Sequence, residues 1–429
     1  MPGESVAPDR IRASLPIYAM LGATALSQVG NMLTFVAVPW FVLQTTGSAA
    51  RTGIAGGAVA LAAVLASLLG GPVVDRLGFK RTSVVSDLAS GVTVAAIPLL
   101  YLTVGLEFWQ LLALVFLGSL LDTPGMTARQ GMIPGLSRRA GMPVERPNSA
   151  YQAIQQGSFL VGPPIAGILI ASLGSSNVLF LDAATFAVSA LLILAAVPRS
   201  GRTAEKGPGD GYLAELLEGM SFVWGNLAMR TIILAAVVCN FLASPLLAVI
   251  LPVYAKQFVG SATGLGAMLA GFGGGALVGA VLYGMVGYRL PRRATLIVCL
   301  GVFGPPLLAL TVQPPLPVVV AALAVCGLAN GPINPIIFTF VQERTPATML
   351  GRVLGALIGL AMAAAPLGMV VAGFALEAAG VGGVLIGTVI LYLTTTIFLM
   401  LSPALRDMDK SLPNARGEGT TTEAGGRKR

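Results

Sequence analysis

The sequence predicts an all-α membrane protein with twelve transmembrane helices in two pseudo-symmetric six-helix bundles. The first observation is composition, because 55% of the 429 residues are hydrophobic and only 10% are charged, whereas soluble chains carry about 25% charged residues. The second is a series of apolar runs, several of them longer than the roughly 18 residues that span a bilayer. The third is a repetition of sequence features between the two halves of the chain.

The apolar runs account for most of the chain. Lipid offers no hydrogen-bonding partner to the backbone, so a spanning segment must satisfy its own N–H and C=O groups. Barrel strands need only about ten residues, and these runs are much longer, so we expect helices. The predicted spans are 16–43, 52–74, 82–104, 108–130, 148–173, 177–197, 231–254, 264–287, 294–312, 316–341, 348–376 and 381–402.

A polar segment, 199–230, divides these spans into a first bundle, 1–198, and a second bundle, 231–402. It begins with several proline and glycine residues and continues as YLAELLEGMSFVWGN. This pattern is typical of a linker that carries a short amphipathic helix at the membrane surface. Residues 403–429 are polar and rich in glycine, and we expect a disordered tail there.

The cationic side chains predict how the chain is oriented in a cell membrane. If the N-terminus is cytoplasmic, all but two of the 26 lysine and arginine residues lie on the cytoplasmic side, and only Arg51 and Lys256 lie outside. This distribution follows the positive-inside rule, so we expect a multi-pass protein with both termini, the linker and the tail in the cytoplasm. The net charge of +8 then faces the inner leaflet, and no nucleic-acid partner is expected.

Residue types that the sequence lacks exclude several classes of function. The chain has no histidine, which removes every mechanism that needs an imidazole base, ligand or proton relay. It has too few charges for a soluble enzyme, and outside the spans it shows no cluster of nucleophile, base and metal ligands. We therefore expect a protein that is no enzyme, holds no metal or cofactor, and works as a monomer in the lipid bilayer.

The two halves resemble one duplicated six-helix unit. Residues of the same or similar type recur 213 positions apart, at the exits of the first and seventh spans and in the loops that follow. Six spans joined to six by a long linker suit a transporter whose bundles rock about a site near the midplane. The recurring pairs are Pro39 and Pro252, Gly47 and Gly260, Ser48 and Ser261, Gly71 and Gly284, Arg76 and Arg289, Lys80 and Arg293, and Gly118 and Gly331.

A charged, glycine-containing loop, GPVVDRLGFKR, joins the second and third spans. Its glycines allow a tight turn, and the Asp75 carboxylate suits a helix N-terminus across the bundle boundary. We predict a gating loop, with the alternative that its cations only set the topology. In the second half Tyr288 and Pro291 replace the aspartate and a glycine, so the lock should be one-sided. The predicted gating residues are Gly71, Asp75, Arg76, Gly78, Lys80 and Arg81, with Asp87 and Arg129 in the same cytoplasmic charge network.

The fifth span carries a second motif, GSFLVGPPIAG. Proline removes a backbone donor and bends a helix, while glycine lets a neighbouring helix come close. The motif residues are Gly157, Gly162, Pro163 and Gly167, and the alternative is a generic kinked packing face.

Both motifs resemble those of a known family. The loop resembles the G-x-x-x-D-R-x-G-[RK]-[RK] motif of the major facilitator superfamily, and the second resembles the antiporter motif of its drug exporters. Stretches such as LSQVGNMLTFVAVPWFVLQTTGS and LFLDAATFAVSALLIL are similar to the macrolide-efflux branch of drug:proton antiporters, and the resemblance covers about residues 15–402. It implies export powered by proton antiport, with a substrate that varies within the branch. It also implies that Asp75 meets the start of the eleventh helix at Arg352.

A proton carrier in a chain without histidine must be a carboxylate. Placing one at mid-bilayer costs roughly 2.5–3.5 kcal/mol, so such residues are functional candidates. Asp122 is the deepest, and Asp182 is a second candidate nearer the outer end of its span. The alternative is that Asp122 pairs with Arg129, seven residues on, as a static lock. Glu107 and Glu377 lie at the outer boundary, where water can reach them.

Polar side chains in mid-span predict a wet substrate cavity. Those of the first span recur at helical spacing on one face. The alternative for each amide is an interhelical hydrogen bond. The predicted cavity residues are Thr24, Gln28, Asn31, Phe35, Gln152, Gln155, Asn240, Ser244, Asn330 and Asn334.

Amide groups with adaptable apolar surface predict an amphipathic substrate of moderate size, such as a macrolide-like antibiotic or another natural product. The expected function is secondary active export of such molecules by proton antiport and alternating access. Export of a siderophore and flipping of a lysolipid by the same machine remain alternatives. An alternative of another class is a membrane sensor or assembly factor that moves nothing.

Overall fold

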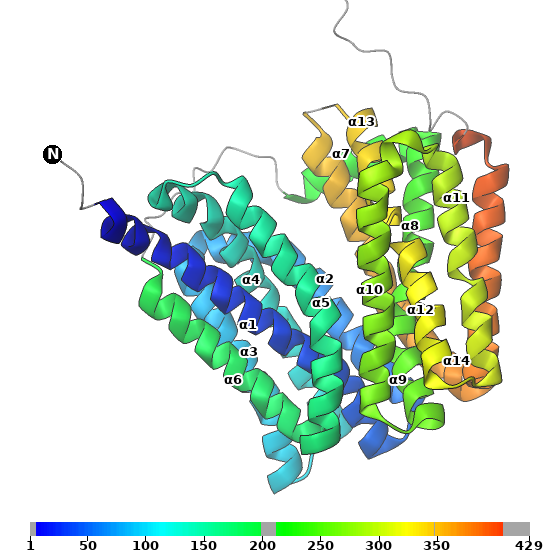
Figure 1. Ribbon diagram of the computed structural model, residues 1–429, viewed down its shortest axis with the longest axis horizontal. Coiled ribbons are helices and arrows are strands. Elements are labelled where there is room, and N and C mark those ends of the chain that lie inside the picture. Colours follow the sequence, from blue (N-terminus) through cyan, green and yellow to red (C-terminus); the bar gives the residue numbers. More distant parts are fainter. Residues whose placement is uncertain (1–5, 199–211, 347, 406–429) are drawn as a thin grey trace, which may run out of the picture.

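The structure is a computed structural model that describes residues 6–198, 212–346 and 348–405. Throughout these ranges the chain forms helices and turns, and no strand is present in them. The helices form two bundles that stand side by side (Figure 1). The first contains α1 to α6, and the second contains α8 to α14.

The first bundle has one helix for each predicted span. Its helices end at small or cap-forming residues, because glycine adopts the left-handed conformation that a helix end needs and serine accepts from exposed N–H groups. Gly47, Gly78 and Gly174 have φ angles of 65°, 79° and 85° at three of these turns. The helices are α1 (Val6–Thr46), α2 (Ala49–Leu77), α3 (Phe79–Thr103), α4 (Phe108–Ala140), α5 (Glu145–Leu173) and α6 (Ser175–Ala196).

The second bundle is built from more broken helices. Prolines remove backbone donors, and two π-helical turns lie beside Pro245 and Pro252 in the first span of this bundle. That span comprises α8 (Leu227–Pro245), η1 (Leu246–Ile250), α9 (Leu251–Tyr254) and η2 (Ala255–Val259). It is followed by α10 (Ala262–Val286), η3 (Gly287–Arg289), α11 (Arg292–Phe303), η4 (Pro305–Val312), α12 (Leu316–Asn330), α13 (Ile333–Arg344), α14 (Leu350–Leu401) and η5 (Pro403–Leu405).

The described residues contain eleven helical segments long and apolar enough to cross a membrane, and the last of them is double. Helix α14 has 52 residues, which at about 1.5 Å per residue is far longer than a hydrocarbon core of about 30 Å. Gly380 interrupts it with the non-helical angles φ 67° and ψ 174°. The chain turns back there, so α14 supplies two spans. The predicted fold of twelve membrane-spanning helices is confirmed.

Helix α7 (Tyr212–Gly225) lies between the bundles in sequence and packs on the second. A Cβ atom on Gly219 would lie 2.4 Å from the carbonyl oxygen of Arg352, so only glycine permits this approach. Glu218 forms an ion pair with Arg352, with 2.5 Å between Oε2 and Nη1. The rest of the predicted linker, 199–211, and residues 406–429 of the predicted tail lie outside the described residues.

The sequence repeat corresponds to a repeat of local structure. Gly260 has a φ angle of 72°, close to that of its counterpart Gly47. Ser48 then caps α2 by accepting from the N–H of Arg51 at 3.1 Å, and Ser261 caps α10 by accepting from the N–H of Gly264 at 3.1 Å. Each half therefore leaves its first span and enters its second through the same turn and cap.

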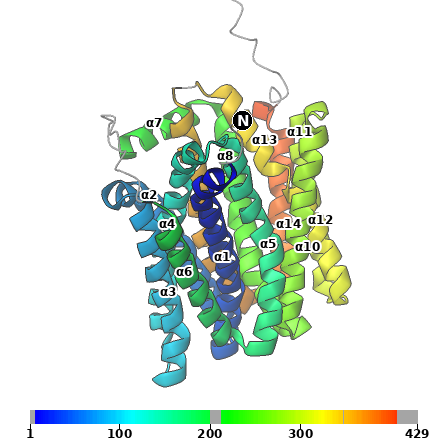
Figure 2. The same cartoon turned by 60° about the vertical axis from the view of Figure 1, so that its left-hand side comes forward.

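The two ends of the molecule differ in how the bundles meet. Helix α7 lies at one end in both views (Figure 1, Figure 2), which we name the α7 face. The opposite end, the far face, carries the turns at Gly47, Gly174, Gly260 and Gly380. The ribbons of the bundles converge toward the far face and separate toward the α7 face (Figure 1). Two helix pairs, α2 with α14 and α5 with α10, make the closure.

Candidate functional site

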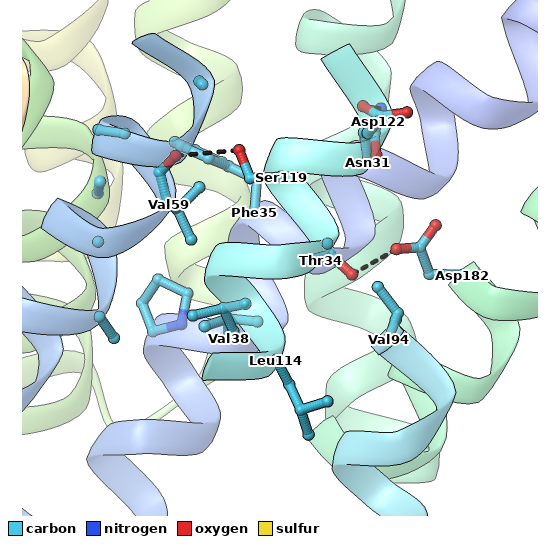
Figure 3. A pocket seen from close by; sticks show the side chains of 18 of the residues that line it. Asn31, Thr34, Phe35, Val38, Val59, Val94, Leu114, Ser119, Asp122 and Asp182 are labelled. Atoms are coloured by element: carbon cyan, nitrogen blue, oxygen red, sulfur yellow. Dashed lines mark hydrogen bonds between the residues drawn. The ribbon is translucent and has the colours of Figure 1, made fainter. Parts of the chain in front are cut away.

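A cavity of about 260 Å³ lies within the first bundle, between α1, α2, α3, α4 and α6. The second bundle contributes Ala248 of η1 and Met369 of α14 to its lining. Most of the wall is apolar, as the side chains of Val38, Val59 and Leu114 illustrate in Figure 3. No lysine or arginine is among the described residues that line it. The cavity therefore combines apolar walls with a small polar end.

Asp122 of α4 is one of two carboxylates at that end (Figure 3). Its Oδ2 atom accepts a hydrogen bond from Nδ2 of Asn31 on α1 at 3.0 Å. Its Oδ1 atom is buried and has no hydrogen-bond partner among the described residues. A buried acceptor without a partner is costly unless a proton or a ligand satisfies it.

Asp182 of α6 is the second carboxylate, and it is fully buried. The Thr34 hydroxyl donates to its Oδ2 atom. The Thr185 hydroxyl donates to the backbone carbonyl oxygen of Asp182 at 2.8 Å and also lies 3.2 Å from Oδ1. Gly30 of α1 makes room for this pair, because a Cβ there would lie 2.1 Å from Oγ1 of Thr185 and 2.3 Å from Oδ1 of Asp182.

The other polar side chains of the lining use their protons within the protein. The hydroxyls of Thr52, Ser90 and Ser119 donate to backbone carbonyl oxygens at 2.9, 3.2 and 3.0 Å. The Thr34 hydroxyl donates to Asp182. Among the buried side-chain atoms of the described lining residues, the one without a partner is thus an acceptor, Oδ1 of Asp122. The site is suited to a proton or to a ligand that donates hydrogen bonds.

Arg129 pairs with Asp87 of α3 and not with Asp122, so the predicted alternative of an Asp122–Arg129 lock is wrong for this conformation. Both partners are buried, with exposures of 1% and 0%. Ser83 accepts from Nε of Arg129 at 3.2 Å, and Ser189 donates to Asp87 at 2.8 Å. Seven residues along one helix separate Asp122 from Arg129 by about 10 Å, and α3 offers a nearer carboxylate.

The predicted gating loop forms the turn between α2 and α3 on the α7 face. Gly78 has the positive φ angle that this turn requires, whereas a Cβ on Gly71 would meet nothing within 4 Å. Lys80 donates to the carbonyl oxygens of Leu194, at 2.8 Å, and Val197 at the end of α6. Arg76 and Arg81 lie in the same turn region and are exposed.

The contact between Asp75 and Arg352 that the resemblance implies is absent from this conformation. Asp75 is exposed at the end of α2, and no hydrogen bond or ion pair joins it to another described residue. Arg352 is instead paired with Glu218 of α7. The physical reason is the separation of the bundles toward the α7 face (Figure 1).

The motif in α5 serves two different contacts. A Cβ on Gly162 would lie 2.4 Å from Cβ of Met32 on α1, within the first bundle. A Cβ on Gly167 would lie 2.5 Å from the carbonyl oxygen of Ala262 on α10, across the bundle boundary. A Cβ on Gly157 would meet nothing within 4 Å, and a Cβ on Gly266 of α10 would lie 2.5 Å from the carbonyl oxygen of Pro163.

Two of the ten predicted cavity residues, Asn31 and Phe35, line the cavity. Thr24 donates to the carbonyl oxygen of Met20 at 2.9 Å, and Asn240 donates to that of Ala236 at 3.1 Å. The rest, Gln28, Gln152, Gln155, Ser244, Asn330 and Asn334, are not among its lining residues. Sequence reasoning missed Gly30 and Thr34. Their position beside Asn31, one turn apart on α1, is the signal that could have indicated a contact with a polar helix.

Comparison with known proteins agrees with this architecture. The model of the Major Facilitator Superfamily matches residues 20–258 and 233–424. The chain is 35% identical over 398 residues to the multidrug efflux pump Tap of Mycobacterium tuberculosis, covering 92% of this chain and 95% of that protein. It is 27% identical over 346 residues to the enterobactin exporter EntS of Escherichia coli O1:K1 / APEC, covering 79% of each.

Among solved structures, the nucleoside transporter NupG has the same fold. It superposes with a TM-score of 0.74 at 14% identity and covers 90% of this chain and 98% of its own. The chain is accordingly a multi-pass membrane transporter and not an enzyme. On the evidence of the family model and of the identity to Tap over almost its whole length, the chain belongs to the major facilitator superfamily.

Proposed function

We propose that the chain exports amphipathic small molecules by proton antiport and alternating access, with Asp122 and Asp182 as the proton-carrying groups. The observation that carries the proposal is the unpartnered Oδ1 atom of Asp122, buried at the polar end of an apolar cavity. The related Tap and EntS proteins are named as an efflux pump and an exporter, which supports outward transport.

The charges of the two faces support an orientation. The α7 face carries the cations of the α2–α3 turn together with Arg138 and Arg139 at the end of α4, whereas the far face carries Arg51 and Lys256. By the positive-inside rule the α7 face is cytoplasmic and the far face is exterior. In this conformation the protein is then closed to the outside and parted toward the cytoplasm, where a substrate for export would enter.

The cavity favours one kind of ligand. Its apolar wall would receive a hydrophobic body, and its free acceptor at Asp122 would receive a hydrogen-bond donor such as an amine. A proton and an amine would compete for the same oxygen, which is the exchange that antiport requires. An anionic ligand would meet two carboxylates, so the cavity supports an amphipathic donor over the siderophore and lysolipid alternatives. Membership of a transporter family argues against the sensor alternative.

The test is flux in proteoliposomes that contain the purified chain. Uptake of erythromycin and of ethidium into these proteoliposomes is measured with an acidic interior and after a protonophore has collapsed the gradient. The native chain should show gradient-dependent uptake, and Asp122→Asn and Asp182→Asn should lose it.

Glu107→Gln is the matched control, because it neutralises an exposed carboxylate at the start of α4 outside the cavity. Equal uptake with and without the gradient in the native chain would overturn proton antiport. An Asp122→Asn protein that behaves like Glu107→Gln would remove Asp122 from the mechanism.

A further inference from the structure

The seam between the bundles on the far face is made twice, by equivalent glycines. Gly53 of α2 and Gly266 of α10 are 213 residues apart, the offset of the sequence repeat. A Cβ on Gly53 would lie 2.5 Å from the carbonyl oxygen of Met369, and one on Gly266 would lie 2.5 Å from that of Pro163. In both cases the helix of one bundle rests directly on the backbone of the other.

The partner helices repeat the pattern four residues later. A Cβ on Gly373 of α14 would lie 2.8 Å from the carbonyl oxygen of Ala49, the first residue of α2. A Cβ on Gly167 of α5 would lie 2.5 Å from the carbonyl oxygen of Ala262, the first residue of α10. The α2–α14 seam and the α5–α10 seam are therefore pseudo-symmetric in backbone contact.

One more helical turn along, the symmetry is broken by charge. On α14 the position four residues after Gly373 is Glu377, whereas on α5 the position four residues after Gly167 is Ala171. Because the α5–α10 seam closes without a carboxylate, the packing of such a seam does not require one. The contribution of Glu377 to closure must therefore come from its charge and hydrogen bonds and not from helix packing.

The Glu377 carboxylate is bound to the N-terminus of α2. Its Oε1 atom accepts from the Ser48 hydroxyl at 2.5 Å and from the N–H of Ala50 at 3.1 Å. The first N–H groups of a helix have no intrahelical partner and carry the positive end of its dipole, so they favour an anion. A carboxylate of the second bundle thus completes a helix cap in the first.

We propose that Glu377 is a latch of the far face, which holds the two bundles together by capping α2 and releases when the far face opens. The inference rests on the proposed alternating access. Helices α2 and α14 run in opposite directions, so the N-terminus of α14 and the end of α2 that carries Asp75 meet on the α7 face when that face closes. When the far face opens and the α7 face closes, helices α2 and α14 would lose the contact of Glu377 with α2 and gain the contact of Asp75 with α14.

The charged groups around Glu377 are consistent with an anion that stays ionised while the latch is closed. Glu377 is exposed in the turn between the two spans of α14. The Ser48 hydroxyl, the Ala50 amide and the positive charge of Arg51 lower the pKa of its carboxyl group. Among the described residues at this face, Arg51 also lies over the ring of Phe108, Lys256 lies over the ring of Trp40, and Glu107 caps α4.

The sign of the pH effect follows from this contact. The closed latch lowers the pKa of Glu377, so opening lets the pKa return toward the ordinary value and protons bind the open form more readily. The contribution of Glu377 to closure is therefore full above the ordinary pKa of about 4.3 for glutamate, and it is lost as the exterior pH falls from there through the lowered pKa of the closed form.

The test measures conformation and not transport. Spin labels at Val104 and Val312, which are exposed and lie on different bundles at the far face, report the distance between the bundles in lipid nanodiscs. The background chain has Cys239, Cys299 and Cys326 replaced by alanine. The native far face should be mainly closed at pH 7 and open progressively below about pH 5.

Glu377→Gln should lower the ratio of closed to open populations at pH 7 by roughly threefold to tenfold and flatten the pH dependence. The ratio of closed to open populations of Glu377→Asp should lie between those of the native chain and Glu377→Gln. Ala171→Glu supplies a carboxylate at the equivalent position of the α5–α10 seam and should raise the closed fraction. Glu107→Gln, which removes a carboxylate from the same face without touching the second bundle, should match the native chain.

Two outcomes separate this proposal from the proposed function. If gradient-driven export depends on Asp122 while Glu377→Gln leaves the distance populations unchanged at every pH, the latch is refuted and the function stands. If Glu377→Gln opens the far face while no gradient-driven export is found, the latch stands and the antiport mechanism falls. A Glu107→Gln protein that shifts as much as Glu377→Gln would also refute the latch, because the effect would then follow surface charge.

Discussion

Asn31 of α1 holds Asp122 of α4 by one oxygen only, with 3.0 Å between Nδ2 and Oδ2, and leaves Oδ1 without a described partner. The two residues are 91 positions apart in sequence and meet at the polar end of the cavity (Figure 3). A single amide therefore orients the carboxylate while keeping one oxygen free for the transported species.

Replacing Asn31 by alanine should impair gradient-driven export strongly. Hydrogen bonds to charged groups contribute about 1.5–3 kcal/mol, so we expect a loss of roughly tenfold or more in initial uptake rate. Ser27→Ala is the control on the same helix, since the Ser27 hydroxyl is buried and has no partner among the described residues. Equal losses in the two variants would contradict the assigned role of Asn31.

Gly30→Ala should destabilise the protein and displace Asp182. The added methyl would collide with Oγ1 of Thr185 and Oδ1 of Asp182, and overpacking of this kind costs about 1–3 kcal/mol. Thermal unfolding in detergent should show a lower midpoint for Gly30→Ala than for the native chain. Gly22→Ala, where the new Cβ meets nothing within 4 Å, should unfold no earlier than the native chain.

Gly53→Ala and Gly266→Ala should each wedge the far face open. Both new Cβ atoms would lie 2.5 Å from a backbone carbonyl oxygen of the other bundle. A backbone carbonyl cannot rotate away as a side chain could, so the helices must separate. Distances between labels at Val104 and Val312 should shift toward the open population in either variant. Gly284→Ala, with no atom within 4 Å of the new Cβ, should leave the distribution as it is.

Removing one partner of the Asp87–Arg129 pair should destabilise the fold more than removing both. Breaking a buried ion pair strands a charge and costs about 3–5 kcal/mol, whereas apolar replacement of the whole pair is often neutral. We expect Arg129→Met to unfold at a markedly lower temperature, and Arg129→Met with Asp87→Leu to recover much of the loss. A double variant less stable than either single variant would show that the pair contributes more than it costs.

The spans and their ends could be predicted from the sequence because they depend on local properties. Apolar length alone located the twelve spans, and the left-handed glycines Gly47 and Gly260 sit at turns that the repeat had marked. The division of α14 at Gly380 is predicted by the short segment EAAG, which carries one glutamate and ends in glycine, between two apolar runs. These features need no knowledge of which helices touch.

The partners of the buried charges could not be predicted in the same way. Whether Arg129 pairs with Asp87 or Asp122 depends on the rotation of α3 and α4 about their axes, which packing over the whole bundle determines. The cavity lies within the first bundle, and eight of the ten polar or aromatic side chains predicted to line a substrate cavity are not among its lining residues. Glu377 was expected only as a solvated boundary residue, because its contact with Ser48 joins positions 329 residues apart.

The walls of the cavity belong almost entirely to one bundle, with Ala248 and Met369 as the contributions of the other. If the five helices of the first bundle that surround the cavity move as one rigid body, a bound molecule would move with them through the transport cycle. The affinity of the cavity for this molecule would then differ little between the inward-open and outward-open states. The second bundle would control only which side of the membrane has access to the bound molecule. Release of the molecule on the exterior side would then have to be caused by proton binding, because a rigid-body motion leaves the shape of the cavity unchanged.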